Sequence, residues 1–320
     1  MKWIVGFSAI AVIVGAAATA TVPAATITPD QAILKLLPPE TQGIAFIDVA
    51  ELRDAALVKD ILAGAGLGIL GKPGDLPEFM VATGLVPQRD VDRVTVGKIN
   101  SREMLAVVEA RYDRFKAEQF LKDKGIEPQI HLGRTVFPMP IDIQHGQRYD
   151  ISAVTFLDNL IIAGQIEAVK KALDQMSLPG SRPLRTDLTE ALRTIEAGSQ
   201  VWAVGDFSIP DLPDLRGPAP ALELLKSLRS GTYQMRVDQD LHARATGNFA
   251  DAEAAKNLGD MGRGLIAVAK LQVASQPDML HLLDGIQVRD SGASVVVNID
   301  EPGDLLKKLK DLRLNRSLAQ

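Results

Sequence analysis

The chain contains no cysteine among its 320 residues. This absence excludes disulfides, thiol catalysis, zinc held by cysteine, iron–sulfur clusters and anchoring through an acylated cysteine. The chain is long enough for two domains of ordinary size. Each can bury a core large enough to fold without covalent links.

Aromatic residues are also scarce, at 4% of the chain. Basic residues do not exceed acidic ones, because 35 Lys and Arg stand against 40 Asp and Glu, for a formal net charge of −5. A nucleic-acid surface needs basic groups that neutralise phosphates and rings that stack on bases. We therefore expect no nucleic acid among the partners.

The common catalytic motifs are absent as well. The chain has neither the His-Glu-x-x-His of zinc proteases nor the Gly-x-Ser-x-Gly of serine hydrolases. The letters of 66–71 match the dinucleotide fingerprint, but they follow a predicted helix, so we interpret them as a loop. Asp238, Asp240 and His242 alternate as metal ligands on one strand would, although a hairpin turn also explains these acids. We predict no catalytic residue, no cofactor and no metal ion.

The N-terminal segment has the layout of a secretory signal peptide. Lys2 precedes an apolar run from Trp3 to Val14, and small residues continue to Ala25. We predict that residues 1–25 are cleaved, which leaves an exported protein in the periplasm or outside the cell. The alternative is an uncleaved anchor, because Trp3 to Ala25 is long enough to span a bilayer as a helix. Membrane contact is expected only through this segment.

An apolar pattern recurs along the chain at a spacing of 137 positions. In each copy an alternating stretch, typical of a strand with one buried face, leads to a helix opened by Asp113 or Asp251. Gly125 can close the first of these helices. A dipeptide suited to a tight hairpin follows, Asp158-Asn159 or Ser291-Gly292. The matching residues are Met104, Ala106, Val108, Tyr112, Ala117 and Leu121, and Leu241, Ala243, Ala245, Phe249, Ala254 and Leu258.

The repeat predicts an α+β protein of two tandem related units, residues 26–178 and 179–320. In each unit we expect a mainly antiparallel sheet with helices packed on one face. The expected order is ferredoxin-like: strand, helix, two strands, helix, two strands. The predicted strands are 43–49, 92–98, 104–111, 151–157 and 160–164, then 200–207, 231–237, 241–248, 285–290 and 293–299. The predicted helices are 28–37, 51–63, 113–124 and 166–176, then 187–197, 251–272 and 304–311.

The two copies differ most after their first strand. The first carries about 21 extra residues there, with a Gly-rich stretch at 64–74, and the second has a Pro-rich connector at 210–220. Glycine at this density disfavours a regular helix, so we expect loops that contact a partner. The alternative is that each loop packs onto its own unit. The candidate contact residues are Leu67, Ile69, Leu70 and Phe79 in the first loop and Ile209, Leu212 and Leu215 in the second.

Asp48 and Asp206 hold equivalent places at the end of the first strand of each unit. As a pair they are candidates for polar groups that line a shared cleft. The alternative is that each aspartate caps the turn or helix that follows it.

The segment Leu37-Pro38-Pro39-Glu40-Thr41, the strand from Gly43 to Val49 and the stretch from Leu52 to Leu62 resemble the opening of a group of exported bacterial proteins. Those uncharacterised proteins carry a duplicated α+β domain of unknown function. The resemblance implies a location in the cell envelope and brings no catalytic residues to this chain.

The sequence therefore predicts an exported, non-enzymatic protein that binds a partner protein or an apolar small molecule. Two alternatives stay open. One is an envelope hydrolase whose site is assembled only in space, and the other is a structural or assembly protein of the envelope.

Overall fold

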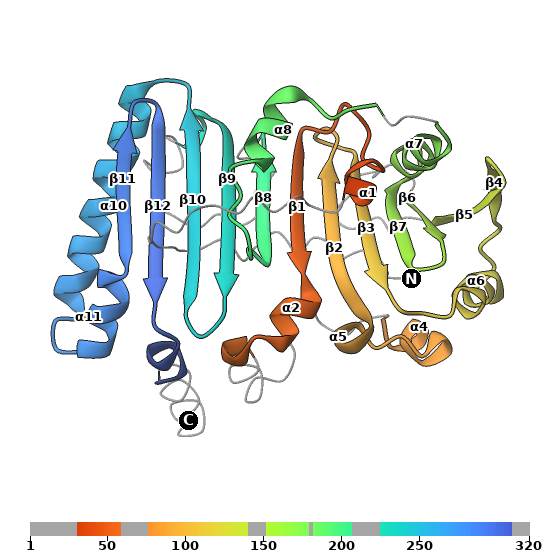
Figure 1. The fold of residues 1–320 in the computed structure, drawn as a ribbon, viewed down its shortest axis with the longest axis horizontal. Coiled ribbons are helices and arrows are strands. Elements are labelled where there is room, and N and C mark those ends of the chain that lie inside the picture. The colour runs from red at the N-terminus through yellow and green to blue at the C-terminus, as the bar shows by residue number, and fades with distance from the viewer. Residues whose placement is uncertain (1–30, 59–75, 140–151, 179–181, 207–224, 309–320) are drawn as a thin grey trace. The chain divides into compact units, whose positions relative to one another are not determined.

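The computed structural model describes residues 31–58, 76–139, 152–178, 182–206 and 225–308 (Figure 1). The chain forms two compact units. Of the described residues, 31–50 and 76–193 belong to the first unit, and 51–58 and 194–308 belong to the second. The predicted signal peptide, the Gly-rich stretch and the Pro-rich connector lie outside the described residues.

The first unit is built on an antiparallel sheet with the strand order β1-β2-β3-β7-β6-β5-β4 (Figure 1). The strands are β1 (Gly43–Asp48), β2 (Val91–Lys98), β3 (Met104–Ala110), β4 (Gln129–His131), β5 (Arg134–Met139), β6 (Ser152–Phe156) and β7 (Leu160–Gln165). The helices are α1 (Gln31–Leu34), α4 (Leu76–Thr83), α5 (Pro87–Asp90), α6 (Arg114–Asp123), α7 (Ile166–Ser177) and α8 (Thr186–Leu192). A further helix, α2 (Val49–Asp54), begins in the first unit and ends in the second.

Helix α6 lies on the connection between two parallel strands. Strands β3 and β6 both pair antiparallel with β7, so they run in the same direction with β7 between them. Asp113 caps the start of α6 as predicted, because its side chain accepts the N–H of Lys116 at 3.1 Å. Gly125 follows the helix with a φ of +76°, a conformation that glycine adopts without strain.

Both faces of the first sheet are covered, which differs from the expected single layer of helices. Phe156 packs with Ala117 and Leu121 of α6 on one face. The alternation of side chains along paired strands puts Gly97 on the opposite face. There Leu37, just after α1, lies so close that a Cβ at position 97 would be 2.9 Å from its Cδ2.

The second unit has the strand order β8-β9-β10-β12-β11, again antiparallel (Figure 1). The strands are β8 (Val201–Gly205), β9 (Leu228–Val237), β10 (Leu241–Phe249), β11 (Ile286–Ser291) and β12 (Ser294–Glu301). The helices are α10 (Ala252–Gln272) and α11 (Pro277–Asp284), and residues 303–308 are also helical. Strands β10 and β11 both pair with β12 and so run parallel to each other, with α10 on their connection.

Helix α10 packs on the sheet through its first half. Asp251 caps the helix as predicted and accepts the N–H of Ala254 at 2.8 Å. The core beneath it is formed by Phe249, Ala254, Ala255 and Val295. Farther along, Gly259 and Gly262 face Asp290 and Val288 of β11, and a Cβ at position 259 would lie 2.8 Å from an Asp290 carboxylate oxygen.

Several elements differ from the prediction. The hairpin β4–β5 and the helices α4, α5 and α11 are absent from it. The helix predicted at 187–197 is α8, which ends at Leu192. The helix predicted at 51–63 begins two residues earlier as α2 and is interrupted at Ala55, after which 56–58 are helical again and 59–63 lie outside the described residues. The hairpin between β11 and β12 turns at Gly292-Ala293, because Ser291 pairs directly with Ser294. Within the described residues no helix is long and apolar enough to cross a membrane.

Candidate functional site

Asp48, one of the two aspartates predicted to line a cleft, is held in a row of charges across three strands. The register puts it opposite Arg93, whose Nε lies 3.1 Å from the Asp48 carboxylate. Arg93 in turn lies opposite Glu109, with 3.7 Å between Nη1 and Oε2. Asp48 is 6% exposed. The row joins β1, β2 and β3. The ion pair with Arg93 therefore explains the buried Asp48 carboxylate by its place within the sheet.

Asp206 follows the end of β8 and is half-buried. It belongs to the second unit and Asp48 to the first. The shared cleft therefore stays a prediction.

The candidate contact residues fall into two groups. Leu67, Ile69, Leu70, Ile209, Leu212 and Leu215 lie outside the described residues. Phe79 is described, and it lies in α4 and packs into the core of the first unit. Its ring meets Phe120 edge-on at 5.5 Å between centroids and stacks near Phe156 at 6.4 Å. These contacts engage the ring within its own unit.

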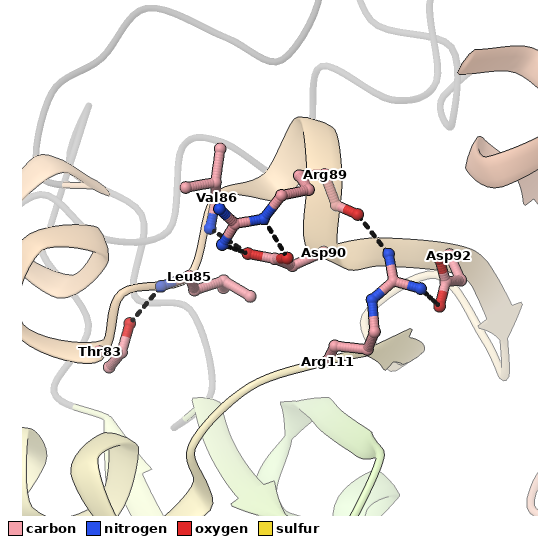
Figure 2. A network of polar contacts seen from close by, with 7 residues as sticks. All are labelled: Thr83, Leu85, Val86, Arg89, Asp90, Asp92 and Arg111. Atoms are coloured by element: carbon pink, nitrogen blue, oxygen red, sulfur yellow. Dashed lines mark hydrogen bonds and ion pairs between the residues drawn. The ribbon is translucent and has the colours of Figure 1, made fainter. Parts of the chain in front are cut away.

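Figure 2 shows a polar network of the first unit, centred on Asp90 at the end of α5. Asp90 is 6% exposed. Its carboxylate accepts two bonds from the Arg89 guanidinium, both 2.7 Å long, and the N–H of Val86 at 2.8 Å. Arg111 donates to the carbonyl oxygen of Arg89 and lies 3.0 Å from the Asp92 carboxylate.

Both carboxylate oxygens of Asp90 accept bonds from within the first unit, which favours a structural role. The Arg89 guanidinium, helped by the Val86 N–H, holds the pKa of Asp90 at about 2. A carboxylate with so low a pKa is a weak base and is poorly suited to take a proton from a substrate. It instead ties Val86, just before α5, to the last residue of that helix.

Asp90→Ala should lower the free energy of unfolding by about 1 kcal/mol, because it leaves the part-buried Val86 N–H without its acceptor. Asp90→Asn is the matched variant, since it keeps an acceptor for Val86 and removes only the charge. The depressed pKa means that the charge stabilises the fold above the ordinary value of 3.8 and ceases to do so as the pH falls towards 2. Urea titrations at pH 7 and pH 2.5 check this, and an equal gap between wild type and Asp90→Asn at both pH values would contradict it.

A second polar cluster lies where β10 begins and β12 ends. His242 and Asp300 face each other in register, with 2.6 Å between Nδ1 and Oδ1. Asp238 accepts the N–H groups of Gln239 and Asp240, at 2.6 and 3.0 Å. The acids of this segment therefore shape a turn, which confirms the turn interpretation. Among the described residues, no three His, Asp or Glu side chains gather closely enough to hold a metal ion.

Beside Asp300, Glu301 ends β12 with its side chain on the other face of the sheet. It is only 3% exposed, and neither carboxylate oxygen has a hydrogen-bond partner in the described structure. Burial, and then the neighbouring Asp300 charge, raises the pKa of Glu301 to about 7. A proton donor of this strength suits acid–base catalysis, but the oxygens are sealed from solvent and so from any substrate.

The second half of α10 presents apolar side chains to solvent. Leu265, Val268 and Leu271 are 50%, 52% and 78% exposed. Their spacing of three residues keeps them on one side of the helix, and we call them the α10 stripe. The sequence pattern indicates an apolar helix here, but it does not indicate which side the sheet leaves uncovered.

The described residues define an α+β protein with antiparallel sheets, polar clusters whose groups are bonded or buried, and an exposed apolar stripe on α10. No family model matches the chain, and no curated protein matches it either. A solved structure described as "Structure of crystal form I of TP0453" is similar at a TM-score of 0.42 and 12% identity. The match covers 90% of this chain and 98% of that one. A similarity of this size supports no conclusion about function.

Proposed function

We propose that the chain is an exported, non-enzymatic protein that binds a partner protein through the α10 stripe. The observation that carries the proposal is the exposure of Leu265, Val268 and Leu271 side by side on the longest described helix. Single exposed leucines are ordinary, whereas adjacent ones form the apolar centre of many interfaces. Export is supported by the N-terminal segment of the sequence.

The charges around the stripe indicate how the partner would be recognised. Arg263 lies 2.7 Å from Asp260 and from Asp290, and Lys270 lies 2.6 Å from Asp284. Cations that are already paired contribute little to attraction at a distance. The partner should therefore offer an apolar surface, and its affinity should change little between low and moderate salt.

We expect a triple variant of the stripe to keep its fold and to lose its partner. The changes are Leu265→Gln, Val268→Gln and Leu271→Gln. Glutamine keeps the helix, so stability should stay within about 1 kcal/mol of wild type. Loss of the partner complex should exceed tenfold, because three apolar contacts at the centre of an interface each contribute on the order of 1 kcal/mol. The matched control is Phe115→Gln on α6, which removes an equally exposed apolar side chain, 76% exposed, from the first unit.

Photo-crosslinking provides the measurement. A photoreactive phenylalanine at position 268, or at 115 as control, is activated in the source cells, and the adducts are sized by mass spectrometry. A protein adduct at 268 that is absent at 115 and lost with glutamine at 265 and 271 supports the proposal. An adduct with the mass of two chains would favour the assembly role. Equal labelling at both positions, or none, would overturn the stripe as a binding surface.

We also infer that the two units arose by duplication of one ancestral unit. In support, the strand order β1-β2-β3-β7-β6 of the first sheet repeats as β8-β9-β10-β12-β11 in the second. Each unit has two parallel strands around an antiparallel neighbour with a helix on the connection, the split arrangement of ferredoxin-like domains. The hairpin β4–β5 would then be an addition to the first copy.

A further inference from the structure

The carboxyl group of Glu301 is buried against Gly285 at the end of the second sheet. Glu301 is the last residue of β12 and faces Leu241 across the strand pair. On one side lies Gly285, which follows α11. A Cβ at position 285 would be 2.3 Å from Oε1 of Glu301 and 2.6 Å from the carbonyl oxygen of Asp300, so only glycine fits.

After Glu301 the chain turns directly into the helical segment 303–308. The N–H of Gly303 donates to Oδ1 of Asp240 at 2.9 Å, and Leu305 donates its N–H to the carbonyl oxygen of Pro302 at 3.0 Å. Leu305 is 5% exposed. A buried carboxyl group therefore lies against one short segment at Gly285 and two residues before another, 303–308.

None of the charged groups on the surrounding described elements forms a hydrogen bond with the Glu301 carboxyl group. Asp300 lies next in sequence and raises the pKa of Glu301, while its own carboxylate is taken by His242 on the opposite face. Lys270 pairs with Asp284 at the end of α11, and Lys308 lies 3.8 Å from Asp278. The remaining charged groups on these elements are Asp238, Asp240, His281, Asp304 and Lys307, with Glu51, Arg53 and Asp54 on the segment that brings Leu57 against Gly303. Within the described structure no cation lies within ion-pair distance of Glu301.

A carboxyl group in this position is stable only when it is neutral. The ionised form would be a buried charge without donors, which is far more costly than a buried neutral acid. Ionisation therefore favours any opening that admits water to the group. The contact that must open is the one with Gly285, and the segment 303–308, which begins two residues after Glu301, is the neighbour that we expect to move with it.

We propose that Glu301 is a proton-controlled latch: when protonated it allows Gly285 and the segment 303–308 to close over the end of the second sheet, and when ionised it releases them. Closure is complete in acid and is lost as the pH rises through neutrality. The sign follows from a carboxyl group that binds its proton more tightly in the folded state than in the unfolded one. The latch does not depend on the α10 stripe or its partner.

Hydrogen–deuterium exchange of the full chain at pH 5.5 and pH 8.5, corrected for the intrinsic rates, tests the latch. Protection of peptides covering 277–286 and 300–308 should fall at least tenfold at the higher pH in wild type. Glu301→Gln should keep its protection at both pH values, because it removes the charge and retains the shape. Glu253→Gln, an exposed change on α10, should behave like wild type.

Unchanged wild-type protection, or the same loss in Glu301→Gln, would overturn the proposal. A second measurement does not depend on any variant that might misfold. Carbon-13 NMR of the side-chain carboxyl groups in wild type should show one glutamate that titrates near pH 7, with the amide signals of Gly285 and Gly303 shifting together with it. If every glutamate titrates near its ordinary value, there is no latch.

Discussion

Phe137→Ala should lower the free energy of unfolding by about 3–5 kcal/mol, the largest loss expected from any side chain of the first unit. The Phe137 ring on β5 is completely buried, and it lies 6.2 Å from the ring of Phe156. Ala117 and Leu121 of α6 pack on the same cluster. Removing the ring would leave a cavity that helix and sheet cannot both close, because each is fixed by its own backbone bonds.

Phe115→Ala is the matched control, since it removes the same side chain from the outer side of α6. Phe115 is 76% exposed, so its loss should change stability by no more than about 0.5 kcal/mol. Urea unfolding followed by circular dichroism gives both values. Equal stability of the two variants would show that β5 does not hold α6 on the sheet.

The strand that carries Phe137 also shows where the sequence pattern fails. Pro138 cannot donate to a strand ladder, and a proline argues against an interior strand. Strand β4 is three residues long, with Ile130 71% exposed, so its pattern carries no period to detect. Strand β5 is a strand because β6 offers it a partner, which is a tertiary fact. The longer alternating strands and the capped helices α6 and α10 need no such partner and are predictable.

Helix α11 is a different kind of miss, because its signals are present in the sequence. Pro277 stands at the first helical position, Asp278 lies in the first turn and Gly285 follows the end. These are the residues that open and close helices. These signals are easily missed because they follow α10 directly in the sequence. The apolar pattern from 251 to 272 already accounts for one helix there and gives no reason to expect another.

The latch residue is intermediate between these two cases. Alternation along β12 carries the buried side from Val295 through Ile299 to Glu301, so its inward direction is predictable from the sequence. The lack of a hydrogen-bond partner for its carboxyl group is not predictable from the sequence. That depends on Gly285, sixteen positions earlier, coming within contact of the carboxyl group. The α10 stripe depends in the same way on which side of a helix the sheet leaves uncovered.

Gly164→Ala should cost about 3 kcal/mol, because β7 passes β3 with no room for a side chain at this position. A Cβ at position 164 would lie 2.2 Å from the carbonyl oxygen of Met104 and 3.1 Å from the Cα of Leu105. Both obstacles are backbone atoms of a paired strand, so neither can rotate away. Relief requires that β3 and β7 separate where Leu105 and Gly164 face each other.

Gly264→Ala is the control for this change. Gly264 lies within α10, and a Cβ there would meet nothing within 4 Å. Alanine should raise the stability by about 0.5–1 kcal/mol, since it favours the helix and restricts the unfolded chain. Thermal unfolding of the two variants should therefore shift in opposite directions. A shift of the same sign in both would mean that the contact between β3 and β7 yields more easily than paired backbone atoms should, and the first sheet would then be less rigid than its register implies.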